Sequence, residues 1–374
     1  MAILRQWSVF YRELMQPVLS YIINQMKRAD ILQLRLWNQG LSAHRFEKPQ
    51  DVVGHLGAMQ AQDYNMAIWA AALRLNAADR AAVESSIHSA QLIRTHILRP
   101  TWHLVHQKDI RWMMELSAPY VKKATRYIDK KEGLTDELFK RCRKIIERLL
   151  HKADQVTKEE IISALSKQRI MVNPLLATQI IIRAELEMLL CSGATKGSYA
   201  LFDQRIPPAA ALSPTEAIVQ LAERYFQSRG PATVRDFAWW SGLSVHEAQT
   251  GIAALGDQLK SFAFNDLKYY YFNVETKIPS PKTVTLLPCY DEYTVGYSEG
   301  RNIALPAGLD SSITGNGIFK PIVLYGNEIA GTWQKNRKTG RAEVQVFSKA
   351  IPPQKLDEGI ARFNRFNQAG SNEG

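Results

Sequence analysis

The sequence has few cysteines and no long apolar run. Its three cysteines, Cys142, Cys191 and Cys289, are widely separated, and none stands in a Cys-x-x-Cys pair or next to a histidine. This spacing argues against disulfides and structural zinc and fits a reducing compartment, so we expect a cytoplasmic protein. No apolar stretch reaches the roughly 20 residues that cross a bilayer, so we expect no membrane partner.

Acidic residues are outnumbered by basic ones. Lys and Arg total 47, Asp and Glu total 36, and the formal net charge is +11. Residues 122–169 hold fourteen basic and eight acidic side chains, which supply +6 of this excess. A basic protein of this size most often binds a polyanion, with DNA or RNA as the first candidate. The alternative is that Lys- and Arg-rich helices are only solvated faces.

The common catalytic signatures are missing: there is no P-loop, no Gly-x-Ser-x-Gly and no His-Glu-x-x-His. His103 and His106 lie on a predicted strand at a spacing that sends them to opposite faces, so a packed or hydrogen-bonded His103 is favoured over a metal ligand. Asp291 and Glu292 form an acidic pair, for which a helix cap or a salt bridge is the commoner use. We expect neither a metal nor an organic cofactor.

The order of predicted elements repeats three times along the chain. With 46% hydrophobic and 22% charged residues, the 374 residues should bury the cores of two or three domains. Each repeat reads as helices followed by a two-stranded hairpin, which is typical of a winged helix-turn-helix. The alternative is a helical bundle with incidental hairpins. We expect an α+β fold of three tandem winged helix-turn-helix units with a small C-terminal antiparallel β region.

Composition and turn signals predict the boundaries of these parts. The predicted parts are a possible N-terminal extension (1–25), a first unit (26–118), a basic helical region with a second unit (119–205), a third unit (206–278), and a β region with a polar tail that frays at its end (279–374).

Two local predictions depend on apolar spacing. The apolar residues Val52, Val53, Leu56 and Met59 predict one face of a helix. Pro174 predicts the start of a helix that ends near 191–193 and is followed by a hairpin over 194–202.

Gln60-Ala61-Gln62 stands where an apolar helix face gives way to polar residues. A glutamine donates and accepts hydrogen bonds but carries no proton to transfer at neutral pH, so chemistry here would be positioning and polarisation. Residues two apart in a helix point about 200° from each other. We therefore predict a helix break or terminus between Met59 and Tyr64. The alternative is that both glutamines only cap backbone groups at a helix junction.

A winged helix reads DNA from its second helix and its wing, so each unit offers candidate DNA contacts. They are Arg94, Arg99 and His103 in the first unit, Lys196 in the second, and Arg235 and His246 in the third. The loop over 334–341 adds Lys335, Arg337, Lys338 and Arg341. Four cations without an acid repel one another unless an anion lies opposite, although solvated loops of this kind also occur.

Several segments resemble the winged-helix family of AlkZ/YcaQ-type DNA glycosylases. They are residues 56–63 with 69–75, 93–95 with 99–105, 230–233 to 242–243, 287–293 and 329–333. The resemblance implies tandem winged helices with a basic concave surface that act on alkylated bases and interstrand crosslinks. It also implies a catalytic Gln-x-Gln motif, or Gln-x-Asp in one branch. Gln60 and Gln62 match the Gln-x-Gln form.

We therefore expect a DNA glycosylase that hydrolyses the N-glycosidic bond of N7- or N3-alkylated purines with a water positioned by a glutamine, and the unhooking of crosslinks is left open. Its partner would be double-stranded DNA, and the protein would be a monomer associated with the nucleoid. The alternative is a non-catalytic winged-helix regulator, which needs basic wings but no carboxamide pair and more often carries a dimerisation segment. RNA binding is a third hypothesis, but the sequence shows no evident exposed aromatic platforms for stacking single strands.

Overall fold

The computed structural model of the chain describes residues 26–43, 45–274, 278, 282–305, 319–347 and 351–369. The predicted extension at 1–25 lies outside the described residues. Within the described ranges, no helix combines the length and the apolar character needed to span a bilayer.

The first part of the chain surrounds a three-stranded sheet with helices. Its elements are α2 (Arg28–Asn38), α3 (Pro49–Leu56), β1 (Ala58–Gln60), α4 (Tyr64–Ala72), α5 (Arg80–His88), β2 (Leu92–His96) and β3 (Trp102–His106). Strand β3 lies in the middle and pairs antiparallel with both β1 and β2. The helix predicted through Met59 ends at Leu56, because Gly57 takes φ +75° and turns the chain into β1.

The same order of elements then occurs twice more. After the long helix α6 (Ile110–Lys131), the second set is α7 (Asp136–Leu150), β4 (Val156–Thr157), α8 (Lys158–Lys167), α9 (Pro174–Leu186), β5 (Leu190–Ser192) and β6 (Ser198–Leu201), followed by α10 (Phe202–Arg205). The third set is α11 (Pro214–Arg229), α12 (Val234–Ser241), α13 (Val245–Leu255), the 3-10 turn η1 (Gly256–Gln258), β7 (Leu259–Phe264) and β8 (Leu267–Phe272). In each set the first extended segment pairs with the last strand; in the third set this segment is Ala232, which bridges to Tyr270.

One boundary in the second set was predicted wrongly. Helix α9 ends at Leu186 rather than near 191–193, and Leu190–Ser192 is strand β5 of the hairpin. Met188 takes φ +51°, which ends the helical conformation. The predicted helix was too long because a short apolar run shows no periodicity that separates a buried strand from a buried helix.

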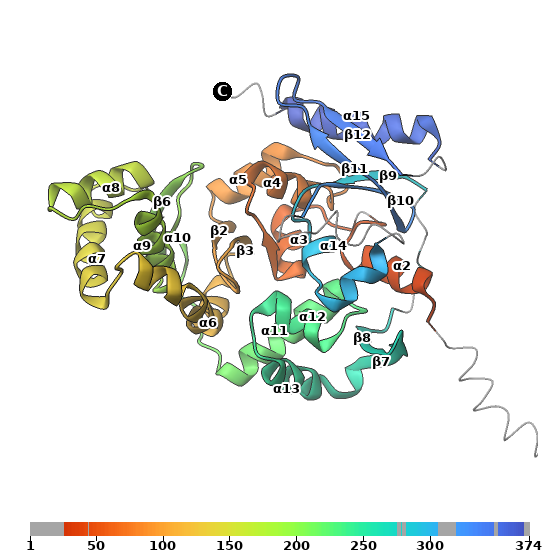
Figure 1. Cartoon of the computed structure of the whole chain (residues 1–374), viewed down its shortest axis with the longest axis horizontal. Helices are drawn as coiled ribbons and strands as arrows, with labels where there is room; N and C mark the ends of the chain where they lie inside the picture. Colours follow the sequence, from red (N-terminus) through yellow and green to blue (C-terminus); the bar gives the residue numbers. More distant parts are fainter. Residues whose placement is uncertain are drawn as a thin grey trace, which may run out of the picture.

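The C-terminal part is a four-stranded antiparallel sheet in the order β12-β11-β10-β9. Its elements are β9 (Val284–Leu287), α14 (Glu292–Val295), the 3-10 helix η2 (Glu299–Ala304), β10 (Ile322–Tyr325), β11 (Glu328–Lys335) and β12 (Ala342–Val346). In Figure 1 this sheet lies at the top, the third set lies at the bottom, and the second set lies to the left of the central first set.

The C-terminal tail contains a helix that the sequence did not predict, and its end, which we predicted to fray, lies outside the described residues. Residues Pro353–Ala369 form the helix α15, which lies beside the C-terminal sheet (Figure 1). Phe363 and Phe366 are buried, and their rings lie 5.4 and 4.6 Å from the ring of Trp69 in α4. These aromatic contacts hold the helix against α4.

The sheet of the first set lies between two hydrophobic cores. Met59 and Leu104 pack into a core shared with the C-terminal sheet and α15. Ala58 and Val105, on the opposite face, pack into a core shared with α11, α12 and α13. Both faces of β1 are therefore covered, although β1 is an edge strand of its sheet. Gln60 is its last residue.

Candidate active site

The Gln60-Ala61-Gln62 segment is not helical. Gln60 ends strand β1, the Ala61 N–H donates to the Trp102 carbonyl at 2.7 Å, and helix α4 begins only after Asp63. No helix therefore runs through the pair, as predicted, although the helix before it ends earlier than we expected. The divergence of about 200° between residues two apart in a helix therefore does not apply to this pair.

The two glutamines differ in exposure and in partners. Gln60 is 9% exposed, and its Oε1 accepts a hydrogen bond from Arg99 Nη2 at 3.3 Å. Gln62 is exposed, and its Oε1 lies 3.5 Å from the donating N–H of Trp102, at the limit of a hydrogen bond. Gln60 is thus held in place, whereas the side chain of Gln62 is held only weakly.

A buried ion pair fixes the backbone that carries Gln60. Glu292 Oε1 accepts from the Gln60 N–H at 2.7 Å, and its Oε2 accepts from Trp240 Nε1 at 3.0 Å and Arg229 Nη2 at 2.5 Å. Arg229 also donates to the carbonyls of Leu56 and Ala58, at 2.7 and 2.8 Å. Because Arg229 and Glu292 are almost completely buried, they hold β1 within a rigid hydrogen-bonded frame.

Asp291, the neighbour of Glu292, has a separate structural role. It caps α14 by accepting from the Tyr293 N–H at 2.9 Å, and it forms a two-bond ion pair with Arg74 at 2.9 Å. Both side chains of this pair are fully buried. The cap-and-salt-bridge interpretation of the Asp291–Glu292 pair is therefore confirmed.

Arg99 lies beside Gln60 on the turn between β2 and β3. Its guanidinium is 5.4 Å from the centre of the Trp239 ring, which is 44% exposed. The indole Nε1 of Trp239 donates to the Val295 carbonyl at 3.3 Å, which orients the ring. Burial, reinforced by the nearby positive charge of Arg229, lowers the pKa of Arg99 to about 10, so its guanidinium is charged at neutral pH.

Arg94 supports the backbone of the same segment from another side. Its Nε donates to the Ala61 carbonyl at 3.0 Å, and its Nη2 lies 3.5 Å from the Gln62 carbonyl. The guanidinium is 4.1 Å from the Trp102 ring centre. Lys196, exposed on the β5–β6 turn, places its Nζ 5.2 Å from the ring of Tyr64, at the start of α4. The structure therefore brings Arg94, Arg99 and Lys196 to the glutamine pair.

His103 lies opposite Gln60 in the β1–β3 pairing but is not a surface residue. It is fully buried, and its Nδ1 lies 2.9 Å from the Thr101 carbonyl. Burial and the charge of Arg99 lower its pKa well below the ordinary value, so the ring is neutral at physiological pH. In this fold His103 is the cross-strand neighbour of Gln60 and does not reach the surface.

The remaining predicted cations lie elsewhere. Arg235 is exposed in α12, one turn before Trp239, and its Nη1 is 3.8 Å from Glu299 Oε2. His246 is exposed at the start of α13. Lys335, Arg337, Lys338 and Arg341 are exposed at the β11–β12 turn of the C-terminal sheet, where Lys335 Nζ donates to Asn367 Oδ1 at 2.8 Å.

Two residues of the site, Arg229 and Trp239, were not expected from the sequence. Arg229 stands in the last turn of α11, where a basic residue is ordinary, so nothing in the sequence marked it as buried. Trp239 and Trp240 are adjacent on α12, so their side chains point in different directions. Trp240 is fully buried in the core, whereas Trp239 is partly exposed. An aromatic residue outside the buried stripe of a helix was the available signal.

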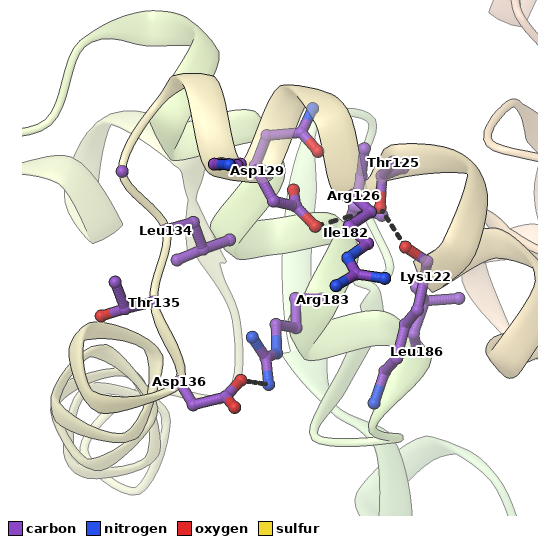
Figure 2. Close-up of a pocket in the computed structure, with 13 residues that line it drawn as sticks. Lys122, Thr125, Arg126, Asp129, Leu134, Thr135, Asp136, Ile182, Arg183 and Leu186 are labelled. Carbon is purple, nitrogen blue, oxygen red and sulfur yellow. Dashed lines mark hydrogen bonds and ion pairs between the residues drawn. The ribbon is translucent and has the colours of Figure 1, made fainter.

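A pocket of about 460 Å³ lies away from the glutamines, between α6, α7 and α9 (Figure 2). Its lining carries basic residues, but Arg183 pairs with Asp136 at 2.5 Å and Lys122 pairs with Glu187 at 3.2 Å. In the described part of the chain, no cluster of three or more His, Cys, Asp or Glu side chains could hold a metal ion.

Comparison with known proteins gives the family. A family model described as DNA glycosylase AlkZ-like matches residues 53–366. A relative from Streptomyces sahachiroi named "Interstrand DNA cross-link repair glycosylase" is 23% identical over 325 residues, 80% of this chain and 85% of the relative. The solved structure of Streptomyces sahachiroi DNA glycosylase AlkZ matches with a TM-score of 0.77 at 20% identity, covering 92% of this chain and 97% of that chain, so the fold is shared. Because the family match spans most of the sequence, this chain belongs to the AlkZ-like DNA glycosylase family.

Proposed function

We propose that this protein is a DNA-repair glycosylase that hydrolyses the N-glycosidic bond of N7- or N3-alkylated purines in duplex DNA. Family membership supports glycosylase chemistry, and the name of the Streptomyces relative supports interstrand crosslinks as further substrates. The observation that carries the proposal is the non-helical Gln60–Gln62 segment, whose backbone is clamped by Glu292, Arg229 and Arg94. This clamp fixes the backbone that carries the two neutral carboxamides, and positioning chemistry requires a backbone fixed in this way.

The substrate supplies most of the driving force. An N7-alkylated purine is cationic, so the C1′–N9 bond breaks with its electron pair going to N9, and the base leaves as a neutral molecule. A water oxygen then bonds to C1′ and its proton passes to solvent. The protein has to place the water and tolerate positive charge on the sugar. Gln62 is exposed, and its carboxamide oxygen can accept a hydrogen bond from that water.

Three tandem winged helices are the proposed frame for DNA binding. The threefold recurrence of one element order, with the first extended segment paired to the last strand each time, supports this assignment. Arg99 and Lys196 then stand on the turns of the first and second hairpins, which would be wings. We assign phosphate contacts to Lys196 and Arg235 and to the four cations of the β11–β12 turn, and we leave the buried His103 out.

A base-release assay on a duplex with one N7-methylguanine tests this function. Wild-type protein should release the base under single-turnover conditions, and Gln62→Ala should release it at least about tenfold more slowly while binding the duplex normally. Lys355→Ala, at a partly exposed position on α15 paired with Glu358, is the matched control and should behave as wild type. Equal release by Gln62→Ala and wild type would remove Gln62 from the mechanism. If neither wild type nor the variants release the base although they bind the duplex normally, a non-catalytic regulator is favoured.

A further inference from the structure

The carboxamide of Gln60 has one accepting and one donating end, and Arg99 decides which end faces inward. A guanidinium has donors only, so the Gln60 atom 3.3 Å from Arg99 Nη2 has to be the carbonyl Oε1. Nε2 is bonded to the same carbon and therefore points away from the guanidinium. Among the described residues, Gln60 Nε2 has no hydrogen-bond partner. It is not among the solvent-excluded side-chain atoms that lack a partner, so it is accessible to solvent.

Arg99 is itself held in this orientation. Its guanidinium lies against Trp239, whose ring is fixed by the hydrogen bond to Val295 and lies 5.9 Å from the guanidinium of Arg301. Arg99 and Gln60 come from one sheet and its turn, whereas Trp239 comes from α12 of the third set. The contact between Arg99 and Trp239 thus joins the Gln60 side chain to a second part of the molecule.

The charge around Gln60 indicates what its free end can bind. An N–H donor beside a charged guanidinium favours an anionic oxygen, and it would disfavour the cationic base or the positively charged sugar. The anionic oxygens in duplex DNA are those of the phosphates. We infer that Arg99, steadied by Trp239, is a positioning residue that turns Gln60 Nε2 outward to donate to a phosphate oxygen next to the lesion, which leaves the water to Gln62. This inference rests on the proposed function.

Gln60→Glu tests the inference directly. Glutamate keeps the oxygen that Arg99 holds but replaces the outward donor with a second acceptor, which would face the phosphate. Single-turnover base release on the N7-methylguanine duplex should therefore fall by about 10- to 100-fold, at least as far as in Gln60→Ala, with weaker duplex binding. Thermal unfolding of each variant checks that the fold is intact.

A duplex with a neutral phosphate analogue distinguishes a phosphate contact by Gln60 from a purely structural role. In a duplex with methylphosphonate beside the lesion, wild-type protein should bind more weakly, while Gln60→Glu should lose less or recover part of its binding. Arg99→Ala should slow release in the wild-type background but add little in the Gln60→Ala background. Arg99→Lys keeps a donor, so it should retain more of the base-release rate than Arg99→Ala, and it replaces Arg99→Ala in the test if that variant folds poorly. Trp239→Phe should slow base release less than Trp239→Ala.

The outcomes separate this inference from the proposed function. If Gln60→Ala is impaired but Gln60→Glu releases base at the wild-type rate, the outward-donor assignment is wrong and the glycosylase proposal stands. If the effects of Arg99→Ala and Gln60→Ala simply multiply, Arg99 acts independently of Gln60 and is not a positioning residue. If Gln60→Ala releases base at the wild-type rate, both the inference and the proposed use of Gln60 fail.

Discussion

The backbone N–H of Gln60 donates to Oε1 of Glu292 at 2.7 Å across 232 residues of sequence. Glu292 is 1% exposed and is paired with Arg229, which donates to the carbonyls of Leu56 and Ala58, just before Gln60 in the chain. The position of the glutamine pair is therefore set by residues of α11 and α14, far from it in the sequence.

Loss of Glu292 should affect both stability and activity. Glu292→Ala leaves Arg229 as a buried charge without its partner, which should lower the free energy of unfolding by about 3–5 kcal/mol. It also removes the acceptor for the Gln60 N–H, so base release should fall even at temperatures where the variant is folded. Arg74→Ala is the control, because it breaks the comparable buried pair with Asp291 without contacting β1. If the two variants show the same release at equal folded fraction, the frame does not position Gln60.

Arg94→Ala should mainly reduce the rate of base release at saturating enzyme. The substitution removes the hydrogen bond to the Ala61 carbonyl and frees the backbone between the glutamines, so we expect a loss of about tenfold. Arg235→Ala removes an exposed cation and should instead weaken duplex binding without changing the saturated rate. Single-turnover rates measured over a range of enzyme concentration separate the two effects. A change confined to Kd in Arg94→Ala would contradict the positioning role.

Neutralising the β11–β12 turn should reduce the salt dependence of duplex binding. Removing one cation that binds a phosphate lowers the slope of log K against log salt by about 0.9, so replacing Lys335, Arg337, Lys338 and Arg341 by alanine should reduce it by up to about 4. Fluorescence anisotropy between about 50 and 200 mM salt measures this slope. An unchanged slope would show that this turn does not meet DNA.

Stability should fall as the pH drops below about 6.5 because of His55. Burial, with added repulsion from Arg45, lowers the pKa of His55 to about 4, and its Nε2 lies 2.6 Å from the Asn38 carbonyl. The unfolded chain takes up a proton near pH 6.5 while the folded protein resists until about pH 4. Above pH 6.5 the titration of His55 therefore does not affect the free energy of unfolding. Between pH 6.5 and 4 it lowers the free energy of unfolding by up to about 3 kcal/mol.

Thermal unfolding across this pH range checks the prediction. His55→Gln keeps a donor for the Asn38 carbonyl but cannot ionise, so its stability should depend less steeply on pH than that of the wild type. His246→Gln, at an exposed position on α13, is the control substitution. A slope in His55→Gln that equals the wild-type slope would assign the acid sensitivity to other groups.

Local signals predicted most of the helices and hairpins. Capping boxes form at Thr157 and Ser244, and β7 and β8 pair as the hairpin that ends the third set. Such features depend on residues a few positions apart, so a single sequence reveals them. Helix α15 was missed because its order depends on aromatic contacts with Trp69, some 300 residues earlier.

The sequence by itself determined the candidate chemistry, because Gln60 and Gln62 are neutral side chains that can position and polarise but cannot transfer a proton at neutral pH. It also determined that the chain carries a large positive charge. Only the tertiary structure decided how the pair is presented. The partners of Gln60 are Arg99 on a neighbouring turn and Glu292 on α14, and the ring that steadies Arg99 is on α12. Packing of distant segments brings these groups together, and no spacing within the Gln60–Gln62 segment encodes it.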